Sequence, residues 1–151
     1  MTRRSRAREV ALQLLFQRDH NPHIDRADLE RFARERLRDA GLAAFCLGLY
    51  DGVAANLEEI DRQLTAKAAN WRVARMAGVD RNVLRLGAYE LRFTPQTPAS
   101  VAINEGIELA RRFGSADSPA FVNGILDQLH KAPVEPAVSE ATPEARGEAA
   151  Q

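Results

Sequence analysis

The sequence predicts an all-α protein, a compact bundle of six to seven helices. No stretch sustains the alternation of apolar and polar residues that a half-buried strand requires, and helix-favouring Ala, Leu, Arg and Glu dominate. The chain has 151 residues, of which 45% are apolar and 28% charged, a composition typical of one soluble domain that folds without a disulfide or a metal. We therefore expect one helical domain at residues 1–131.

Two helices are expected in the first part of the chain. The first spans 4–19 and ends before Pro22, because proline cannot continue a helix. The second spans 25–40, with Asp25 as its N-cap and Gly41 in the left-handed conformation that ends many helices.

The third expected helix, at 42–67, is the longest. Gly48 and Gly52 lie one turn apart within it. Glycine costs about 1 kcal/mol relative to alanine in a helix interior, so we expect another helix to approach closely at both positions.

Three further helices follow a poorly periodic connection. The expected spans are 80–93, capped by Asp80, then 99–113, and finally 118–130 with Ser118 as its N-cap. Residues 132–151 are rich in Pro, Ala and Glu and contain no large apolar residue beyond two valines, so we expect a disordered acidic tail there.

Charge is balanced overall but unevenly placed. Basic and acidic side chains both number 21, so no global field draws the chain to nucleic acid or to a membrane.

No run approaches the roughly 18 apolar residues of a membrane span. The single Cys46 sits in an apolar run, which favours a buried thiol and a reducing compartment. These observations predict a cytoplasmic protein.

The first eight residues contain four arginines and no acid: Arg3, Arg4, Arg6 and Arg8. A helix N-terminus carries a partial positive charge, so basic residues in the first turn are unfavourable there. One interpretation is a frayed, solvated helix end. The other is a phosphate-binding arm, because guanidinium groups bind phosphate oxygens in pairs and stay charged at physiological pH.

Two apolar residues of the first helix lie outside its buried stripe. At 100° per residue, Leu12 and Phe16 fall one turn apart on the side shared with Glu9. Either a wide groove covers them, or they form a contact with a protein partner.

The start of the last helix offers a similar choice. Phe121 lies at the edge of the buried stripe, beside Asp117 and Ser118. An aromatic ring next to helix-start amides can stack on a base, but from this helix alone simple packing is the safer interpretation.

Catalytic and metal-binding signals are missing. His20, His23 and His130 lack metal-ligand spacing, and no phosphate loop or nucleophile motif is present. We expect no enzyme, cofactor or metal site. The competing hypotheses are a self-associating protein-binding regulator, with a homodimer left open, and a small enzyme that uses Glu58, Asp61 or His130.

Three stretches carry a family resemblance. They are RSRAREVALQLLF at 4–16, DRNVLRLGAYEL at 80–91, and VAINE at 101–105 leading to FG at 113–114 and FVNGILD at 121–127. In this order and spacing they resemble the NusB family of bacterial transcription antitermination factors.

The resemblance implies a fold of two small helical subdomains and binding to the boxA element of nascent RNA. It also implies a complex with the ribosomal protein NusE, and this pair joins RNA polymerase and other Nus factors during the transcription of ribosomal RNA. The family's RNA-contacting positions match the N-terminal arginines, with Ser5 where a further basic residue is common, and Asp117 and Phe121. Its NusE-contacting aromatic matches Phe16.

Two further positions follow from the same comparison. An acid at the start of the helix at 80–93 has a partner-binding role in the family and matches Asp80, although capping explains Asp80 equally well. The matching arginine, Arg85, is either a partner contact or a structural ion-pair former.

Overall fold

The computed structural model describes residues 2–69 and 71–132, and these form seven α-helices and one short 3-10 turn, with no strand among them. The elements are α1 (Arg3–His20), α2 (Arg26–Leu37), α3 (Ala40–Ala55), α4 (Leu57–Lys67), η1 (Val73–Arg75), α5 (Gly78–Phe93), α6 (Ala99–Phe113) and α7 (Ser118–Lys131). The all-α prediction is confirmed. Apart from Ala132, the expected disordered tail lies outside the described residues.

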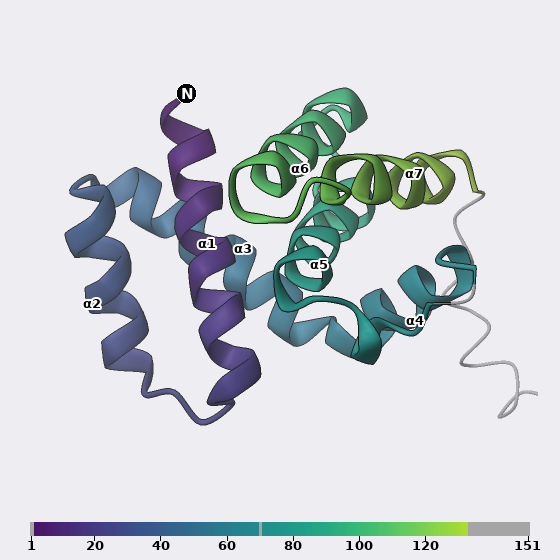
Figure 1. Cartoon of the computed structure of the whole chain (residues 1–151). Coiled ribbons are helices and arrows are strands. Elements are labelled where there is room, and N and C mark those ends of the chain that lie inside the picture. The colour runs from purple at the N-terminus through teal and green to yellow at the C-terminus, as the bar shows by residue number, and fades with distance from the viewer. Residues whose placement is uncertain (1, 70, 133–151) are drawn as a thin grey trace, which may run out of the picture.

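The helices pack in two groups that meet through α1, α3 and α5. Helices α1, α2 and α3 contact one another, α5, α6 and α7 form a second cluster with α4 against it, and both α1 and α3 contact α5. Figure 1 shows α2 on one side of α1 and α5, α6 and α7 on the other, with α3 passing behind. The fully buried side chains include Leu14, Leu84 and Leu126, one from each of α1, α5 and α7, so one core joins both groups.

The N-terminal ends of α1 and α2 are fixed by short polar side chains. Thr2 Oγ1 accepts a hydrogen bond of 3.0 Å from the backbone N–H of Ser5, and Asp25 Oδ1 accepts one of 3.2 Å from that of Ala27. Each bond satisfies a backbone donor that has no partner within its helix. The prediction that Asp25 caps the second helix is confirmed.

The junction between α2 and α3 differs from the sequence prediction. Helix α2 ends at Leu37, and the left-handed residue is Arg38, with φ 54°, not Gly41. Asp39 Oδ1 accepts a 2.9 Å hydrogen bond from the N–H of Leu42, which starts α3 at Ala40 and places Gly41 in its first turn. The capping aspartate therefore decides where the new helix begins.

The predicted long helix at 42–67 is two helices. Helices α3 and α4 meet at Asn56 with a bend of 75°. The Gly52 carbonyl accepts a 3.2 Å hydrogen bond from the backbone N–H of Asn56 and a second one of 2.8 Å from Asn56 Nδ2, so the side chain of Asn56 folds back onto the end of α3. No single helix within 2–69 and 71–132 is long and apolar enough to cross a membrane, and only this bent pair passes that test by length and composition.

The prediction of close helix packing is correct at Gly52 and wrong at Gly48. A Cβ placed on Gly52 would overlap the ring of Tyr89 from α5, whereas a Cβ on Gly48 would meet no atom within 4 Å. Gly52 therefore permits the contact between α3 and α5, and Gly48 lies on the exposed side of α3.

The last three helices match their predicted spans closely, but two of their caps differ. Helix α5 starts at Gly78, so Asp80 lies inside its first turn, where a negative charge still suits the helix dipole. Ser118 is the first residue of α7, and its hydroxyl accepts a 2.9 Å hydrogen bond from the N–H of Ser115 in the preceding turn.

Cys46 is fully buried as predicted, and burial raises the pKa of its thiol to about 12, so it stays protonated.

The two glycines of α3 provide a matched test of this packing. We expect Gly52→Ala to lower the free energy of unfolding by about 1–3 kcal/mol, because Tyr89 must move. Gly48→Ala is expected to raise it by about 0.5–1 kcal/mol, since alanine favours the helix and meets open space. Urea denaturation of both variants measures this, and equal effects at the two positions would contradict the assigned helix contact.

Candidate functional site

Three of the N-terminal arginines are accessible on the first turns of α1. The side chain of Arg3 is 74% exposed and forms an ion pair with Asp39, and Arg6 Nη1 lies 2.8 Å from Glu9 Oε1. Among the described residues Arg4 has no acidic partner, and its guanidinium lies over the ring of Phe45, 4.8 Å from the centroid. The arm therefore presents cations to solvent, and Arg4 is the least engaged of them.

Arg8 differs from the other N-terminal arginines because it is buried, which argues against the RNA contact expected of it. Its side chain is only 5% exposed, and its Nε and Nη2 each donate a 2.8 Å hydrogen bond to the carboxylate of Glu90 on α5. Burial alone would lower the pKa of Arg8, but the hydrogen bonds and charge of Glu90 and the charge of Glu105 outweigh it and raise that pKa. Arg8 holds α1 to α5 and has little surface to offer a phosphate.

The turn between α6 and α7 carries the other predicted RNA contacts. Asp117 is exposed and directly precedes α7, and Phe121 lies half-buried one turn further on. Glu9 connects this region to the arm, because Arg112 near the end of α6 lies 3.0 Å from Glu9 Oε2 while Arg6 binds the other oxygen. Glu9 thus links the basic arm to the end of α6, next to the turn that holds Asp117.

A groove of about 400 Å³ lies along the C-terminal half of α1. Its lining comes from α1, α2, α5 and the end of α6: Leu12, Gln13, Phe16, Gln17, Phe32, Arg36, Val79 and Phe113. Phe16 is 38% exposed, stacks at a tilt on His20 with ring centroids 5.0 Å apart, and sits over Gly78. The groove is mainly apolar with polar edges, which suits a protein segment more than a polyanion.

Two predicted partner residues have different positions from those expected. Leu12 is buried and forms part of the groove wall, so of the two interpretations left open by the sequence the structure favours the covered one for Leu12. Asp80 lies beside Val79 at the start of α5, partly buried, and its Oδ1 has no hydrogen-bond partner among the described residues. That oxygen is itself buried, so in this conformation it is not accessible to a donor from outside the chain.

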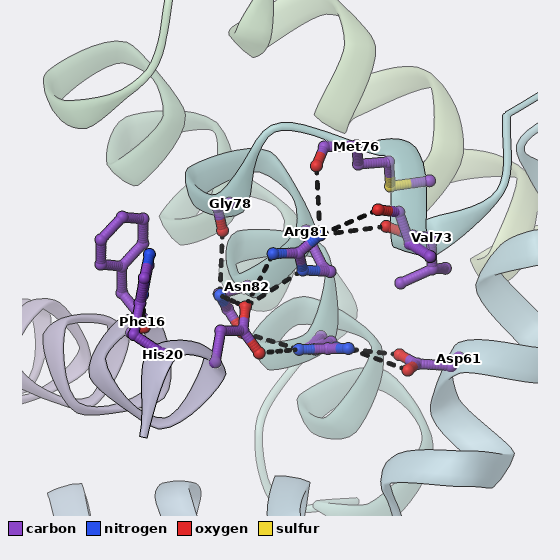
Figure 2. A network of polar contacts seen from close by, with 11 residues as sticks. Phe16, His20, Asp61, Val73, Met76, Gly78, Arg81 and Asn82 are labelled. Carbon is purple, nitrogen blue, oxygen red and sulfur yellow. Dashed lines mark hydrogen bonds and ion pairs between the residues drawn. The ribbon is translucent and has the colours of Figure 1, made fainter. Parts of the chain in front are cut away.

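Asp19 at the end of α1 is the centre of a polar network that joins α1, α4 and α5. Figure 2 shows this network around the labelled Arg81, Asn82 and Asp61. Asp19 Oδ2 accepts hydrogen bonds from Asn82 Nδ2 at 2.8 Å and from Arg81 Nη2 at 2.9 Å, and its Oδ1 accepts one from Arg85 Nη1 at 3.0 Å. Arg85 also binds both oxygens of Asp61 at 2.9 Å. Its side chain is buried, so of the two interpretations of Arg85 the structure favours the ion-pair former.

Sequence reasoning missed this network. The available signal was Asp19 itself, because an acid in the last turn of a helix opposes the helix dipole and needs compensation from elsewhere. The three donors that supply this compensation follow more than 60 residues later, beyond the reach of helix periodicity.

The residues of the enzyme hypothesis lie in ordinary structural settings. Asp61 is bound by Arg85, and Glu58 and His130 are exposed on α4 and α7. Within 2–69 and 71–132, no group of three or more His, Cys, Asp and Glu side chains is placed to hold a metal ion.

Comparisons with known proteins identify the family to which these features correspond. The model of the NusB family matches residues 5–131. The chain is 43% identical over 134 residues to the transcription antitermination protein NusB of Bdellovibrio bacteriovorus, which covers 87% of this chain and 98% of that protein. It is 44% identical over 130 residues to NusB of Desulfatibacillum aliphaticivorans, with 86% and 91% covered.

Solved structures give the same result for the fold. A crystal structure of T. maritima NusB superposes with a TM-score of 0.77 at 36% identity and covers 89% of this chain and 94% of that one. A crystal structure of the antitermination factors NusB and NusE in complex with dsRNA superposes with a TM-score of 0.79 at 25% identity, covering 88% and 99%. The resemblance predicted from the three sequence motifs is confirmed.

The Asp19 network makes stability depend on pH in a defined direction. Burial alone would raise the pKa of Asp19, but the hydrogen bond from Asn82 and the charges and hydrogen bonds of Arg85 and Arg81 outweigh it and hold the pKa below its ordinary 3.8. Asp19 therefore contributes stability above about pH 4, and this contribution is lost as the pH falls through its folded-state pKa. We expect Asp19→Asn to cost about 3 kcal/mol at pH 7 and progressively less below pH 4.

Urea denaturation between pH 7 and pH 3 measures this difference. Asp28→Asn is the matched control, because Asp28 forms an exposed ion pair with Arg31 and is expected to cost less than about 1 kcal/mol. A constant cost of Asp19→Asn over the whole pH range would mean that the charge of Asp19 has no part in holding the helices together.

Proposed function

Because the chain belongs to the NusB family, we propose that it is an RNA-binding transcription antitermination factor. It binds boxA RNA together with the ribosomal protein NusE and joins RNA polymerase and other Nus factors on ribosomal RNA operons in the cytoplasm. It acts as a non-enzymatic adaptor. The family match over residues 5–131 is the observation that carries this proposal.

The arrangement of the two candidate surfaces supports the same conclusion. The arginine arm occupies the first turns of α1, and the apolar groove follows its C-terminal half. From Arg4 to Phe16 the helix rises about 18 Å, so RNA and a protein can occupy one molecule side by side without competing. A relative 25% identical to this chain is found in one crystal with NusE and dsRNA.

In this proposal each surface has its own residues. Arg3, Arg4 and Arg6 contact RNA phosphates, and Asp117 and Phe121 contact a base at the start of α7. Phe16 and Asp80 contact NusE across the groove, with Leu12 as part of its wall. Each partner adds contact area for the other, so we expect RNA affinity to be higher in the presence of NusE.

A filter-binding assay tests the proposal with boxA-like and scrambled RNA, with and without NusE. We expect the boxA-like RNA to bind more tightly, and NusE to increase the difference. Equal binding of both RNAs under all conditions would remove the boxA assignment. Sedimentation over a concentration range, with and without RNA, tests the alternative of a homodimer that hides the arginine arm.

The exposed arginines are expected to contribute through phosphate contacts. Arg4→Ala combined with Arg6→Ala should weaken RNA binding and flatten the slope of log affinity against log salt by roughly 1.4, since each single-strand phosphate contact contributes about 0.7. Arg31→Ala with Arg34→Ala, both exposed on α2, removes the same charge and should leave the slope unchanged.

Arg8→Ala serves to distinguish a loss of phosphate contacts from a loss of stability. Arg8→Ala leaves Glu90 buried without its cation and is expected to lower the free energy of unfolding by about 3–5 kcal/mol. If the arm double variant has the wild-type salt slope, Arg4 and Arg6 do not contact phosphates.

Phe16 is expected to contribute to protein binding more than to stability. Phe16→Asp places a charge on a partly exposed groove wall, so it should weaken NusE binding at least tenfold while the thermal unfolding transition stays cooperative. Calorimetric titration with NusE and a melting curve measure the two effects. Global unfolding of the variant would identify Phe16 as a core residue.

A further inference from the structure

Trp71 is the most exposed large apolar side chain in the described part of the molecule. It follows α4, it is 53% exposed, and neither candidate surface described above includes it. Tryptophan is usually largely covered in a folded protein, so an open indole ring on a fixed loop marks a candidate contact surface.

The ring of Trp71 lies against the ring of Phe121 from α7. Their centroids are 6.4 Å apart and their planes are inclined by 78°, an edge-to-face arrangement. The two residues are 50 positions apart in the sequence, and packing of the loop after α4 against the start of α7 brings them together. An accessible aromatic surface therefore continues from Phe121 onto Trp71.

Two unpaired cations accompany this ring. Arg72 and Arg75 are exposed, and among the described residues neither has an ion pair or a side-chain hydrogen bond. In the N-terminal arm, by contrast, Arg3 and Arg6 already bind acids of the same chain. Free guanidinium groups one and four positions after an exposed tryptophan match the phosphates and bases of a nucleic-acid strand.

The loop that carries these residues is held firmly. The backbone N–H of Trp71 donates a 3.0 Å hydrogen bond to the carbonyl of Ala68, and Val73 and Met76 are buried. From α5, Arg81 Nη1 donates to the carbonyls of Val73 at 3.4 Å and Met76 at 3.2 Å, as Figure 2 shows. Because these contacts anchor the loop before any ligand arrives, little ordering entropy is lost on binding.

We propose that Trp71, Arg72 and Arg75 form a second RNA subsite that continues the one at Phe121. The indole ring stacks on a base next to the nucleotide at Phe121, and the two guanidinium groups contact the adjoining phosphates. This inference rests on the proposed RNA binding at Phe121 and extends it. Stacked bases in a duplex are parallel, whereas these rings are nearly perpendicular, so the occupant is single-stranded RNA with splayed bases.

Trp71 is the only tryptophan of the chain, so intrinsic fluorescence reports directly on this subsite. The full-length protein is titrated with a short boxA-like RNA and with the same RNA extended by three nucleotides at its 5′ or its 3′ end. We expect one extension to quench the fluorescence more strongly and to bind on the order of tenfold more tightly, the gain expected for one stacked base.

Variants separate stacking from charge. Trp71→Ala should abolish the gain from the extension and leave binding of the short RNA unchanged, whereas Trp71→Phe should retain most of it. Arg72→Ala with Arg75→Ala should flatten the salt dependence for the extended RNA only, and Arg31→Ala with Arg34→Ala on α2 serves as the charge-matched control. The conservative phenylalanine and the two arginine variants keep the test valid if Trp71→Ala fails to fold.

The outcomes distinguish this inference from the function on which it rests. If the short RNA binds but neither extension improves affinity or quenches Trp71, the second subsite is wrong and RNA binding at the arm stands. If the quench appears with NusE alone, Trp71 belongs to a protein contact and the inference is overturned. If no RNA binds and the arm variants change nothing, both proposals fail.

Discussion

The structure depends on two charged contacts that join α1 to α5. In one of them α1 supplies the cation, and in the other it supplies the anion. Near the start of α1, Arg8 binds Glu90 toward the end of α5, and near its end Asp19 binds Arg81 and Arg85 toward the start of α5. Only an antiparallel alignment brings these opposite charges together, because a parallel one would place Arg8 beside the arginines. Buried ion pairs contribute little net stability, but mispairing them is expensive, so they select the alignment.

This alignment determines which residues share a surface. It places the end of α1 beside the start of α5, so Phe16 meets Gly78 and shares a groove with Val79. At the other end, Ser5 donates a 2.5 Å hydrogen bond to Glu105, and Glu9 binds Arg112, so the arm lies against α6. The two candidate partners are thus assigned to opposite ends of one helix, and Arg81 connects the groove end to the loop that carries Trp71.

The sequence predicted what local chemistry controls and missed what distant residues decide. The span of α6 and the cap Asp25 follow from proline, glycine and capping signals within a few residues. The break at Asn56 was missed because both flanking segments are good helix formers, and tertiary packing decides the bend. Arg8 and Phe16 both fell in motif positions, but only the fold shows that one is bound by Glu90 and the other borders open space.

The partners of the arginines also bear on the proposed RNA binding. Arg3 and Arg6 already form ion pairs with Asp39 and Glu9. A phosphate at either position replaces that ion pair, so binding gains only the difference between the two interaction energies. Arg4, Arg72 and Arg75 lose no acidic partner on binding, because none is found for them among the described residues. With a formal net charge of zero, long-range attraction adds little, so the proposed RNA affinity depends on such local contacts and on the second proposed partner.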